Sequence, residues 1–210
     1  MRLFLIVIAV AAASSFALLP TAKNPVNTKH TPATTLPGTA TKNGFKRVQS
    51  FAGEVKLYAA KHHYNTRYCF LIDMKIPCGS NRFFVYDLTK DSICKAGLVA
   101  HGYGNSNGAN VSFSNVPGSN SSSVGKYKVG ASYNGKFGLA FKLYGLDSTN
   151  SNAFNRFVVL HSHDCVPAAE VAPQTICMSQ GCPTVAPAFL NSLKVYLDNA
   201  EEPILLRIFY

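Results

Sequence analysis

The 210-residue sequence predicts a mainly β domain with one helix before the strands and a second helix near the C-terminus. The first observation behind this is a series of short apolar runs, rich in β-branched and aromatic residues and separated by Gly, Ser and Asn. The second is that apolar residues recur at three- and four-residue steps in residues 48–59 and 189–197. With 47% hydrophobic and 14% charged residues, the chain can bury the core of one domain.

The N-terminus has the pattern of a secretory signal over residues 1–22. Arg2 precedes an apolar run from Leu3 to Val10, and small residues follow. Cleavage after Ala17 or after Ala22 fits this pattern equally well. The apolar stretch is marginal in length for a membrane-spanning helix, so we expect no stable span after cleavage. The sequence therefore predicts a periplasmic or extracellular protein.

Residues 23–45 are rich in Thr, Pro, Asn, Lys and Ala and contain almost nothing large and apolar. This composition predicts a flexible linker between the export signal and a folded domain over residues 46–210. The first helix of that domain begins near Val48. The second follows Pro187, a residue suited to the first turn of a helix.

Between the two helices, turn residues separate the apolar runs that we expect to form strands. Residues 102–125 are full of Gly, Asn and Ser, and a loop of that length in a compact domain is usually functional. We expect this loop to form a wall or lid of a cleft. The predicted strands are Arg82 to Leu88, Ile93 to His101, Lys126 to Val129, Leu139 to Tyr144, Phe157 to His161 and Ile204 to Tyr210.

The formal charge of +10 indicates attraction to an anionic surface or polymer. The lysines are scattered, and no recognition-helix, zinc-finger or ribonucleoprotein pattern is present, so we expect no nucleic-acid partner. We also expect a monomer.

The most distinctive local pattern is Ser179-Gln180-Gly181-Cys182-Pro183. A nucleophilic cysteine needs a lowered pKa, a base and backbone donors for an oxyanion. Gly181 allows close backbone approach to a substrate, and the helix that opens after Pro183 favours a thiolate through its dipole. A buried structural cysteine in a tight turn is the competing interpretation.

A partner for Cys182 lies 21 residues earlier, where an apolar strand ends at His161. A histidine at the end of a buried strand can be held rigidly with its ring facing a cleft, which suits a general base. His163 lies two positions on, and on an extended chain it shares the face of His161. His163 is therefore the rival base, and a core histidine bonded to the backbone is the alternative for His161.

An ordered set of motifs between Arg82 and Val185 resembles the murein L,D-transpeptidase catalytic-domain family (YkuD-like). The sequence departs from the family pattern at Ser162, Met178 and Pro183, where glycine or arginine residues are common in the family. The matching stretches are residues 82–88, 99–102, 112–115, 117–119, 122–125, 133–138, 143–146, 158–161 and 179–183.

This resemblance implies a mainly β catalytic domain of the L,D-transpeptidase-like sandwich or barrel type, with Cys182 as nucleophile and His161 as base. Cys182 would attack the carbonyl of the third residue of a peptidoglycan stem peptide and expel the terminal D-alanine, without cofactor or metal. The acyl group would pass to an amine of a neighbouring stem. Ser179 and Gly181 match the residues that shape the nucleophile turn. The resemblance assigns His101, Ser112, Ser123 and Gly125 to the substrate cleft.

The missing arginines leave recognition of the substrate carboxylate unassigned, and Lys126, Lys128 or Lys142 could provide it. Three alternatives to the transpeptidase remain. Water could replace the acceptor amine, which gives an L,D-carboxypeptidase. The domain could bind wall polymer without catalysis. A metallopeptidase could use the dense ligand-type residues 161–165 with His101 as a third ligand.

The six cysteines constrain one another, because a catalytic Cys182 must stay a thiol and five cannot all pair. A bridge between Cys165 and Cys177 could hold base and nucleophile in register, and closing such a loop contributes roughly 3 kcal/mol. We expect a second pair between Cys94 and either Cys69 or Cys78. A reversible Cys177–Cys182 bond is the competing outcome.

Overall fold

The computed structural model describes residues 42–106 and 110–210 of the chain. The predicted signal, residues 1–22, lies outside the described residues, as does most of the predicted linker, residues 23–45. The first described element is the helix α1 (Lys42–His62), so the last four residues assigned to the linker lie in this helix.

The described strands form one sheet that holds nearly all of the regular structure. Its order is β3-β2-β1-β9-β5-β6-β7-β8-β4, with β1/β9 and β7/β8 parallel and the other neighbours antiparallel. The strands are β1 (Tyr68–Asp73), β2 (Phe83–Asp87), β3 (Ser92–Gly97), β4 (Val99–Ala100), β5 (Gly125–Gly135), β6 (Gly138–Gly145), β7 (Val159–Ser162), β8 (Thr184–Val185) and β9 (Leu205–Phe209).

The sheet curls so far that its two ends meet through the chain itself. β3 and β4 lie at opposite ends of the strand order, yet only Leu98 separates them in sequence. One apolar core accordingly contains residues from both halves of the sheet, such as Phe83 of β2 and Leu143 of β6. The mainly β, barrel-like fold with two helices that the sequence predicts is confirmed.

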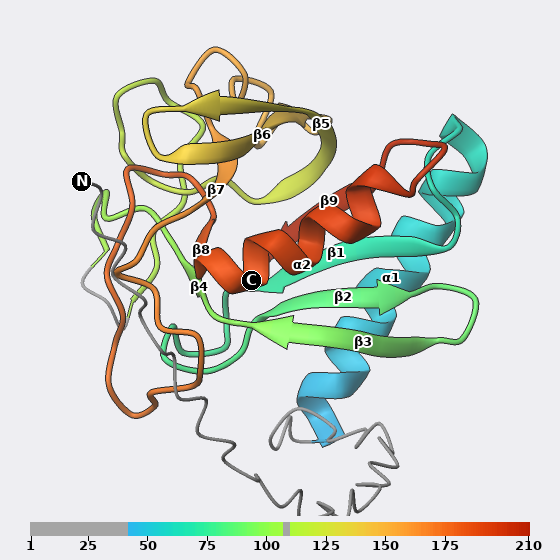
Figure 1. The fold of residues 1–210 in the computed structure, drawn as a ribbon, viewed down its shortest axis with the longest axis horizontal. Coiled ribbons are helices and arrows are strands. Elements are labelled where there is room, and N and C mark those ends of the chain that lie inside the picture. The colour runs from blue at the N-terminus through green and yellow to red at the C-terminus, as the bar shows by residue number, and fades with distance from the viewer. Residues whose placement is uncertain (1–41, 107–109) are drawn as a thin grey trace, which may run out of the picture. The chain divides into compact units, whose positions relative to one another are not determined.

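The half of the sheet formed by β1, β2 and β9 is covered on both faces, as Figure 1 shows. On β1, Cys69 and Leu71 pack with α1, whereas Phe70 and Ile72 pack with the core beneath α2 (Pro187–Asp198). Such double burial makes β1 apolar without alternation, which is why the sequence pattern does not single it out as a strand.

Helix α1 docks through an apolar stripe and one ion pair. Val48, Ala52, Val55 and Ala59 recur at helical spacing and are buried against the sheet. At the edge of this stripe, Arg47 donates two hydrogen bonds to the buried carboxylate of Asp73 at the end of β1, at 3.0 and 2.8 Å. This bidentate contact fixes the N-terminal part of the helix to the sheet.

Several local details differ from the predicted strands. The stretch predicted as one strand from Ile93 to His101 is divided at Leu98 into β3 and β4, and the strand predicted to end at Val129 continues to Gly135 in β5. The strand predicted to start at Phe157 starts at Val159, because Phe157 closes a turn with a left-handed backbone, φ 56°. The short strand β8 had no signal in the sequence, since two residues are too few to show a period.

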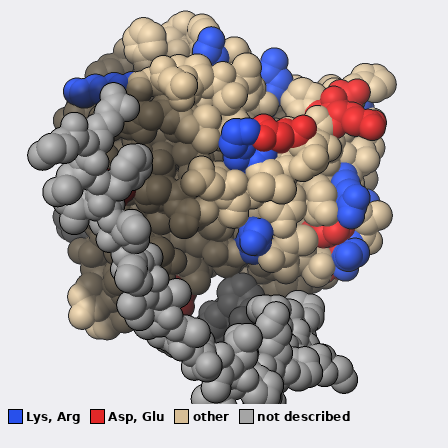
Figure 2. Space-filling model, in the orientation of Figure 1, with Lys and Arg blue, Asp and Glu red and all other residues tan. Residues whose placement is uncertain are grey.

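The sequence predicted attraction to an anionic surface and no stable membrane span, and the distribution of charge and the length of the helices can be compared with these two predictions. Figure 2 shows the Lys and Arg residues of one face as separate groups, with acidic residues beside some of them, rather than as one continuous patch. In residues 42–106 and 110–210, no helix is long and apolar enough to cross a membrane.

We predict that Arg47→Ala lowers the free energy of unfolding by about 1–3 kcal/mol, because the buried Asp73 carboxylate loses its charged donor. Urea denaturation of the two proteins measures this difference. The exposed neighbour Lys46 provides the control, and Lys46→Ala should change stability by less than about 0.5 kcal/mol. Equal effects of both substitutions would contradict the assigned role of the Arg47–Asp73 pair.

Candidate active site

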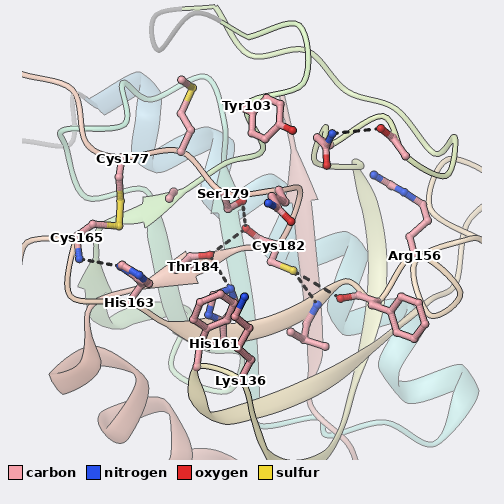
Figure 3. A pocket seen from close by; sticks show the side chains of 18 of the residues that line it. Tyr103, Lys136, Arg156, His161, His163, Cys165, Cys177, Ser179, Cys182 and Thr184 are labelled. Atoms are coloured by element: carbon pink, nitrogen blue, oxygen red, sulfur yellow. Dashed lines mark hydrogen bonds between the residues drawn. A yellow bond between two sulfur atoms is a disulfide. The ribbon is translucent and has the colours of Figure 1, made fainter.

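A cleft of about 670 Å³ opens where β7 and β8 lie side by side (Figure 3). The turn between β5 and β6, the connection from β7 to β8, and described residues of the stretch 102–125 form the other walls of the cleft. Tyr103, Gly118 and Asn120 of that loop line the cleft, so the loop forms a wall, as the sequence predicts.

Cys182 lies in this cleft, immediately after a glycine with φ 115° and two residues before β8 begins. Its Sγ accepts a hydrogen bond from the Val159 N–H at 3.4 Å and donates to the Phe157 carbonyl at 3.6 Å. Burial raises the pKa of the Cys182 thiol, and the Val159 N–H and the charge of Arg156 offset part of that rise. At rest the residue is therefore a thiol.

The helix dipole that the sequence argument placed at Cys182 does not act there. Helix α2 begins only at Pro187, with β8 in between. The groups that favour the thiolate are instead Val159 and Arg156, on the segment that leads into β7.

The nucleophile turn is held by two serines. The Ser179 hydroxyl donates to the Cys182 carbonyl at 2.6 Å and accepts from the Gly181 N–H at 3.1 Å. Ser122 donates to the Gly181 carbonyl at 3.2 Å. A Cβ on Gly181 would lie 3.0 Å from the Ser121 carbonyl oxygen, and the positive φ also favours glycine. The structure thus brings Ser179 and Gly181 together in the turn before Cys182, where the family resemblance placed them.

His161 lies on β7, opposite Ala140 of β6 and Thr184 of β8. Its Nδ1 lies 3.0 Å from the Ser162 carbonyl oxygen, which can only accept, so Nδ1 carries the proton. Its Nε2 lies 3.0 Å from the Thr184 hydroxyl, and its ring stacks on Phe137 with 5.1 Å between centroids. Burial lowers the pKa of His161, the bond to Ser162 opposes this, and His163 lowers it further.

The resting site accordingly holds a neutral thiol and a neutral imidazole. The hydrogen bonds of the Cys182 sulfur are to Phe157 and Val159, and the ring of His161 bonds Ser162 and Thr184. Cys182 and His161 both line the cleft, and in this resting arrangement each is hydrogen-bonded to other groups.

His163, the rival base, also lines the cleft but lies beyond the end of β7. It is exposed, and its Nδ1 accepts the N–H of Cys165 at 3.1 Å, next to the disulfide. Because His161 is buried beside Thr184 on the strand that pairs with the nucleophile segment, the geometry favours His161 as the base.

Arg156 belongs to the site, although no sequence pattern marked it. Its two terminal nitrogens donate to the Ser114 and Ser121 carbonyls and to the Ser119 and Ser123 hydroxyls, at 2.6–3.3 Å. These bonds hold the long loop against the segment that leads into β7. Arg156 also lines the cleft, so its charge acts on Cys182 while its terminal N–H groups are occupied.

The four residues assigned to the substrate cleft lie behind its walls rather than among the lining residues. The Ser112 hydroxyl accepts a hydrogen bond from the Asn105 N–H, and the Ser123 hydroxyl is hydrogen-bonded to the Tyr127 hydroxyl. Gly125 has φ 137° and lies against Asn150.

His101 is fully buried, and its Nδ1 accepts from the equally buried Arg82 at 2.8 Å. Burial and the Arg82 charge lower the pKa of His101 to about 4. His101 is therefore neutral with its proton on Nε2, and that nitrogen has no partner in the described part of the chain.

The lysines proposed for carboxylate recognition also lie outside the lining of the cleft. Lys126 pairs with Asp147 at 2.6 Å, and Lys128 lies over the ring of Tyr144. The lining contains Lys136 of the β5–β6 turn instead, and of the described residues that line the cleft none is Asp or Glu.

Cys165 and Cys177 form a disulfide with their Cα atoms 6.0 Å apart, which confirms the predicted bridge. Both residues line the cleft. The predicted second pair is wrong, and so is the alternative Cys177–Cys182 bond. Cys94 of β3 is separated from Cys69 of β1 by the whole of β2, roughly 9–10 Å, beyond the reach of a disulfide. Cys78 lies buried among Leu98, Val166 and Ile176.

The ligand set of the metallopeptidase alternative is dispersed. Cys165 is in the disulfide and His101 is bound to Arg82, away from the lining of the cleft. Within residues 42–106 and 110–210, no three His, Cys, Asp or Glu side chains converge in a way that could hold an ion.

A curled β-sheet with a cysteine and a histidine in one cleft defines the class of domain that the sequence motifs resemble. Residues 41–202 match the L,D-transpeptidase catalytic domain. The chain belongs to this family. Among curated protein sequences, none matches the chain.

Two solved structures illustrate more distant likeness. The Ldtfm–avibactam carbamoyl enzyme has 13% identity and a TM-score of 0.41, with 69% of this chain and 49% of that chain covered. The helical cell shape determining protein Pgp2 from Campylobacter jejuni has 12% identity and a TM-score of 0.42, with 76% and 54% covered. The chain thus spans about half the length of these proteins.

We predict that His161→Ala slows alkylation of Cys182 by iodoacetamide at pH 7 by about 10²-fold, the usual contribution of a general base. The pKa of the thiol is raised above its ordinary value, so without the base the thiolate should form only at clearly alkaline pH. Because the pKa of His161 is lowered, the wild-type rate should persist below pH 6.5.

Mass spectrometry of the Cys182 peptide separates this reaction from alkylation of the exposed Cys94. His163→Ala is the matched control and should change the rate at pH 7 by less than about threefold, since a lost neighbouring His perturbs the base only slightly. A larger loss in His163→Ala than in His161→Ala would reverse the assignment of the base.

Proposed function

We propose that the chain is an exported L,D-transpeptidase that acts on peptidoglycan stem peptides through a Cys182 acyl-enzyme. The observation that carries this proposal is that Cys182 and a buried, neutral His161 line the same cleft in a domain of this family. The cleft volume of about 670 Å³ lies within the usual range of ligand sites.

The reaction begins when the Cys182 thiol gives its proton to Nε2 of His161. The thiolate then attacks the carbonyl carbon of the third stem residue, and backbone N–H groups of the nucleophile turn stabilise the oxyanion. As the tetrahedral intermediate collapses, the bond to the terminal D-alanine breaks and its amine takes the proton from His161. A thioester on Cys182 remains.

The second half transfers the acyl group to an amine of a neighbouring stem. His161, now neutral again, takes a proton from this amine as it attacks the thioester. The Cys182 sulfur leaves and recovers a proton, and a new amide cross-link has formed. Arg156 and the Val159 N–H favour the thiolate in both halves.

The charge of the cleft supports an anionic substrate. Lys136 and Arg156 line it without any acidic residue in the described lining. The terminal N–H groups of Arg156 already have partners, whereas the exposed Lys136 ammonium lies 5.6 Å from the centroid of the Phe137 ring. We therefore assign the stem carboxylate to Lys136.

Water as the acceptor would make the same domain an L,D-carboxypeptidase, because both reactions share the thioester. A domain that only binds wall polymer would need neither the groups that favour the Cys182 thiolate nor the imidazole of His161 in the same cleft. The Val159 N–H and Arg156 charge directed at the sulfur favour a catalytic domain over that alternative.

The test is incubation of the exported protein with tetrapeptide muropeptides, followed by mass spectrometry of the products. Cross-linked dimers with released D-alanine are expected. Tripeptides with D-alanine and no dimers would identify the carboxypeptidase. Unchanged tetrapeptides would contradict both enzymatic functions. Cys182→Ala should abolish turnover and leave the melting temperature within about 3 °C, because the side chain is sterically minor.

We predict that Lys136→Ala raises KM for the tetrapeptide about tenfold, the cost of one lost hydrogen bond to a charged group. The value of kcat should change little, because Lys136 is assigned to binding the carboxylate and to no proton transfer. Lys128→Ala is the control, since this cation lies over Tyr144 and outside the lining of the cleft. Equal KM values for the wild type and Lys136→Ala would remove the assignment of the carboxylate to this residue.

A further inference from the structure

We propose that Thr184 is a positioning residue whose hydroxyl turns between two partners as His161 gains and loses its proton. It donates to Nε2 of the neutral imidazole and accepts from Nε2–H of the imidazolium. In the second state it donates to the Cys182 carbonyl instead.

Thr184 is placed for this role by the sheet. It is the first residue of β8 and lies directly opposite His161 in the parallel pair β7/β8. Val185, the next residue, points into the core, so Thr184 faces the cleft. The side chain is 3% exposed, and Figure 3 shows it between Cys182 and His161.

Both partners are already within reach of the one hydroxyl. Thr184 Oγ1 lies 3.0 Å from His161 Nε2 and 3.3 Å from the Cys182 carbonyl oxygen. A hydroxyl carries one proton, so it can donate to only one of them at a time. The Cys182 carbonyl also accepts from Ser179, and its two lone pairs allow both bonds.

The state of the imidazole decides which bond forms. With Nδ1–H held by the Ser162 carbonyl, the neutral ring presents a lone pair at Nε2, and Thr184 donates to it. The Nε2 lone pair can take the thiol proton only after the Thr184 proton has turned from Nε2 to the Cys182 carbonyl. Once the thiol proton is on Nε2, that nitrogen is a donor. The hydroxyl then accepts, and its own proton is free to point to the Cys182 carbonyl.

A buried imidazolium without an acceptor would be costly, because burial disfavours the charged ring. The charged and titratable groups near the His161 ring do little to stabilise its positive charge. His163 follows on the same chain, Lys136 comes from the β5–β6 turn, and Lys142 lies on β6 two residues from Ala140, the partner of His161. The lining also contains Arg156, Cys182, Tyr103 and Tyr133, and none of its described residues is a carboxylate.

The inference rests on the proposed function only in using His161 as the base. Its test needs no stem peptide, so its result stands whether or not the chain processes muropeptides. The readout is the rate at which iodoacetamide alkylates Cys182, followed on the Cys182 peptide from pH 5 to pH 11 in wild type, Thr184→Val and Thr184→Ser.

Thr184→Val keeps the shape and removes the hydroxyl. We expect alkylation about tenfold slower at pH 7, since a bond to a charged group is lost while only a neutral one is lost in the resting state. At pH 11, where the thiol ionises without help, the rates should converge. Thr184→Ser should restore most of the rate at pH 7.

Three results would overturn the proposal. These are wild-type rates for Thr184→Val at pH 7, a loss of equal size at every pH, or an equal loss in Thr184→Ser. If Thr184→Val does not fold, nitrogen-15 NMR of the wild-type imidazole decides. The Nδ1–H tautomer at neutral pH and a second, exchange-protected N–H on protonation support the proposal, and a neutral Nε2–H tautomer contradicts it.

Discussion

The parallel pairing of β7 with β8 is the constraint on which the rest of the site depends. It sets His161 directly opposite Thr184, and Thr184 follows Cys182 by two residues in the sequence. A parallel pair needs a long connection, and residues 163–183 provide it with the disulfide and the nucleophile turn. Three residues that follow β4, namely Tyr103, Gly118 and Asn120, contribute to another part of the cleft wall.

The electrostatics of the cleft follow from this placement. Cys182 and His161 are both removed from water, and burial favours the uncharged form of each. Groups of opposite effect surround the sulfur. The Val159 N–H and the charge of Arg156 favour the thiolate, whereas burial and the Phe157 carbonyl, which accepts from the thiol, favour the protonated form. The hydrogen bond from the thiol to the Phe157 carbonyl must break before the sulfur can act as the nucleophile that we propose.

Local pattern in the sequence was enough for some parts of this protein and not for others. The Cys165–Cys177 bridge was predicted from two cysteines that bracket one loop, and the structure confirms it. Cys182 and His161 were proposed from short motifs, and their catalytic roles stay predictions. Thr184, Arg156 and Lys136 depend on register and on how loops close over the cleft, which no single segment encodes. Strand β1 was missed because burial on both faces removes its alternation. The Cys94 pairing failed because β2 lies between the two strands concerned, a fact of topology.

The disulfide and the nucleophile share a small volume, and this has a consequence for oxidative maturation. Cys177 must find Cys165 while Cys182 stands only five residues away, so the wrong partner is the nearer one along the chain. Thiol–disulfide exchange requires a thiolate, and burial keeps Cys182 protonated once the domain has formed. In the folded protein, burial therefore slows exchange between the Cys182 thiol and the nearby Cys165–Cys177 disulfide.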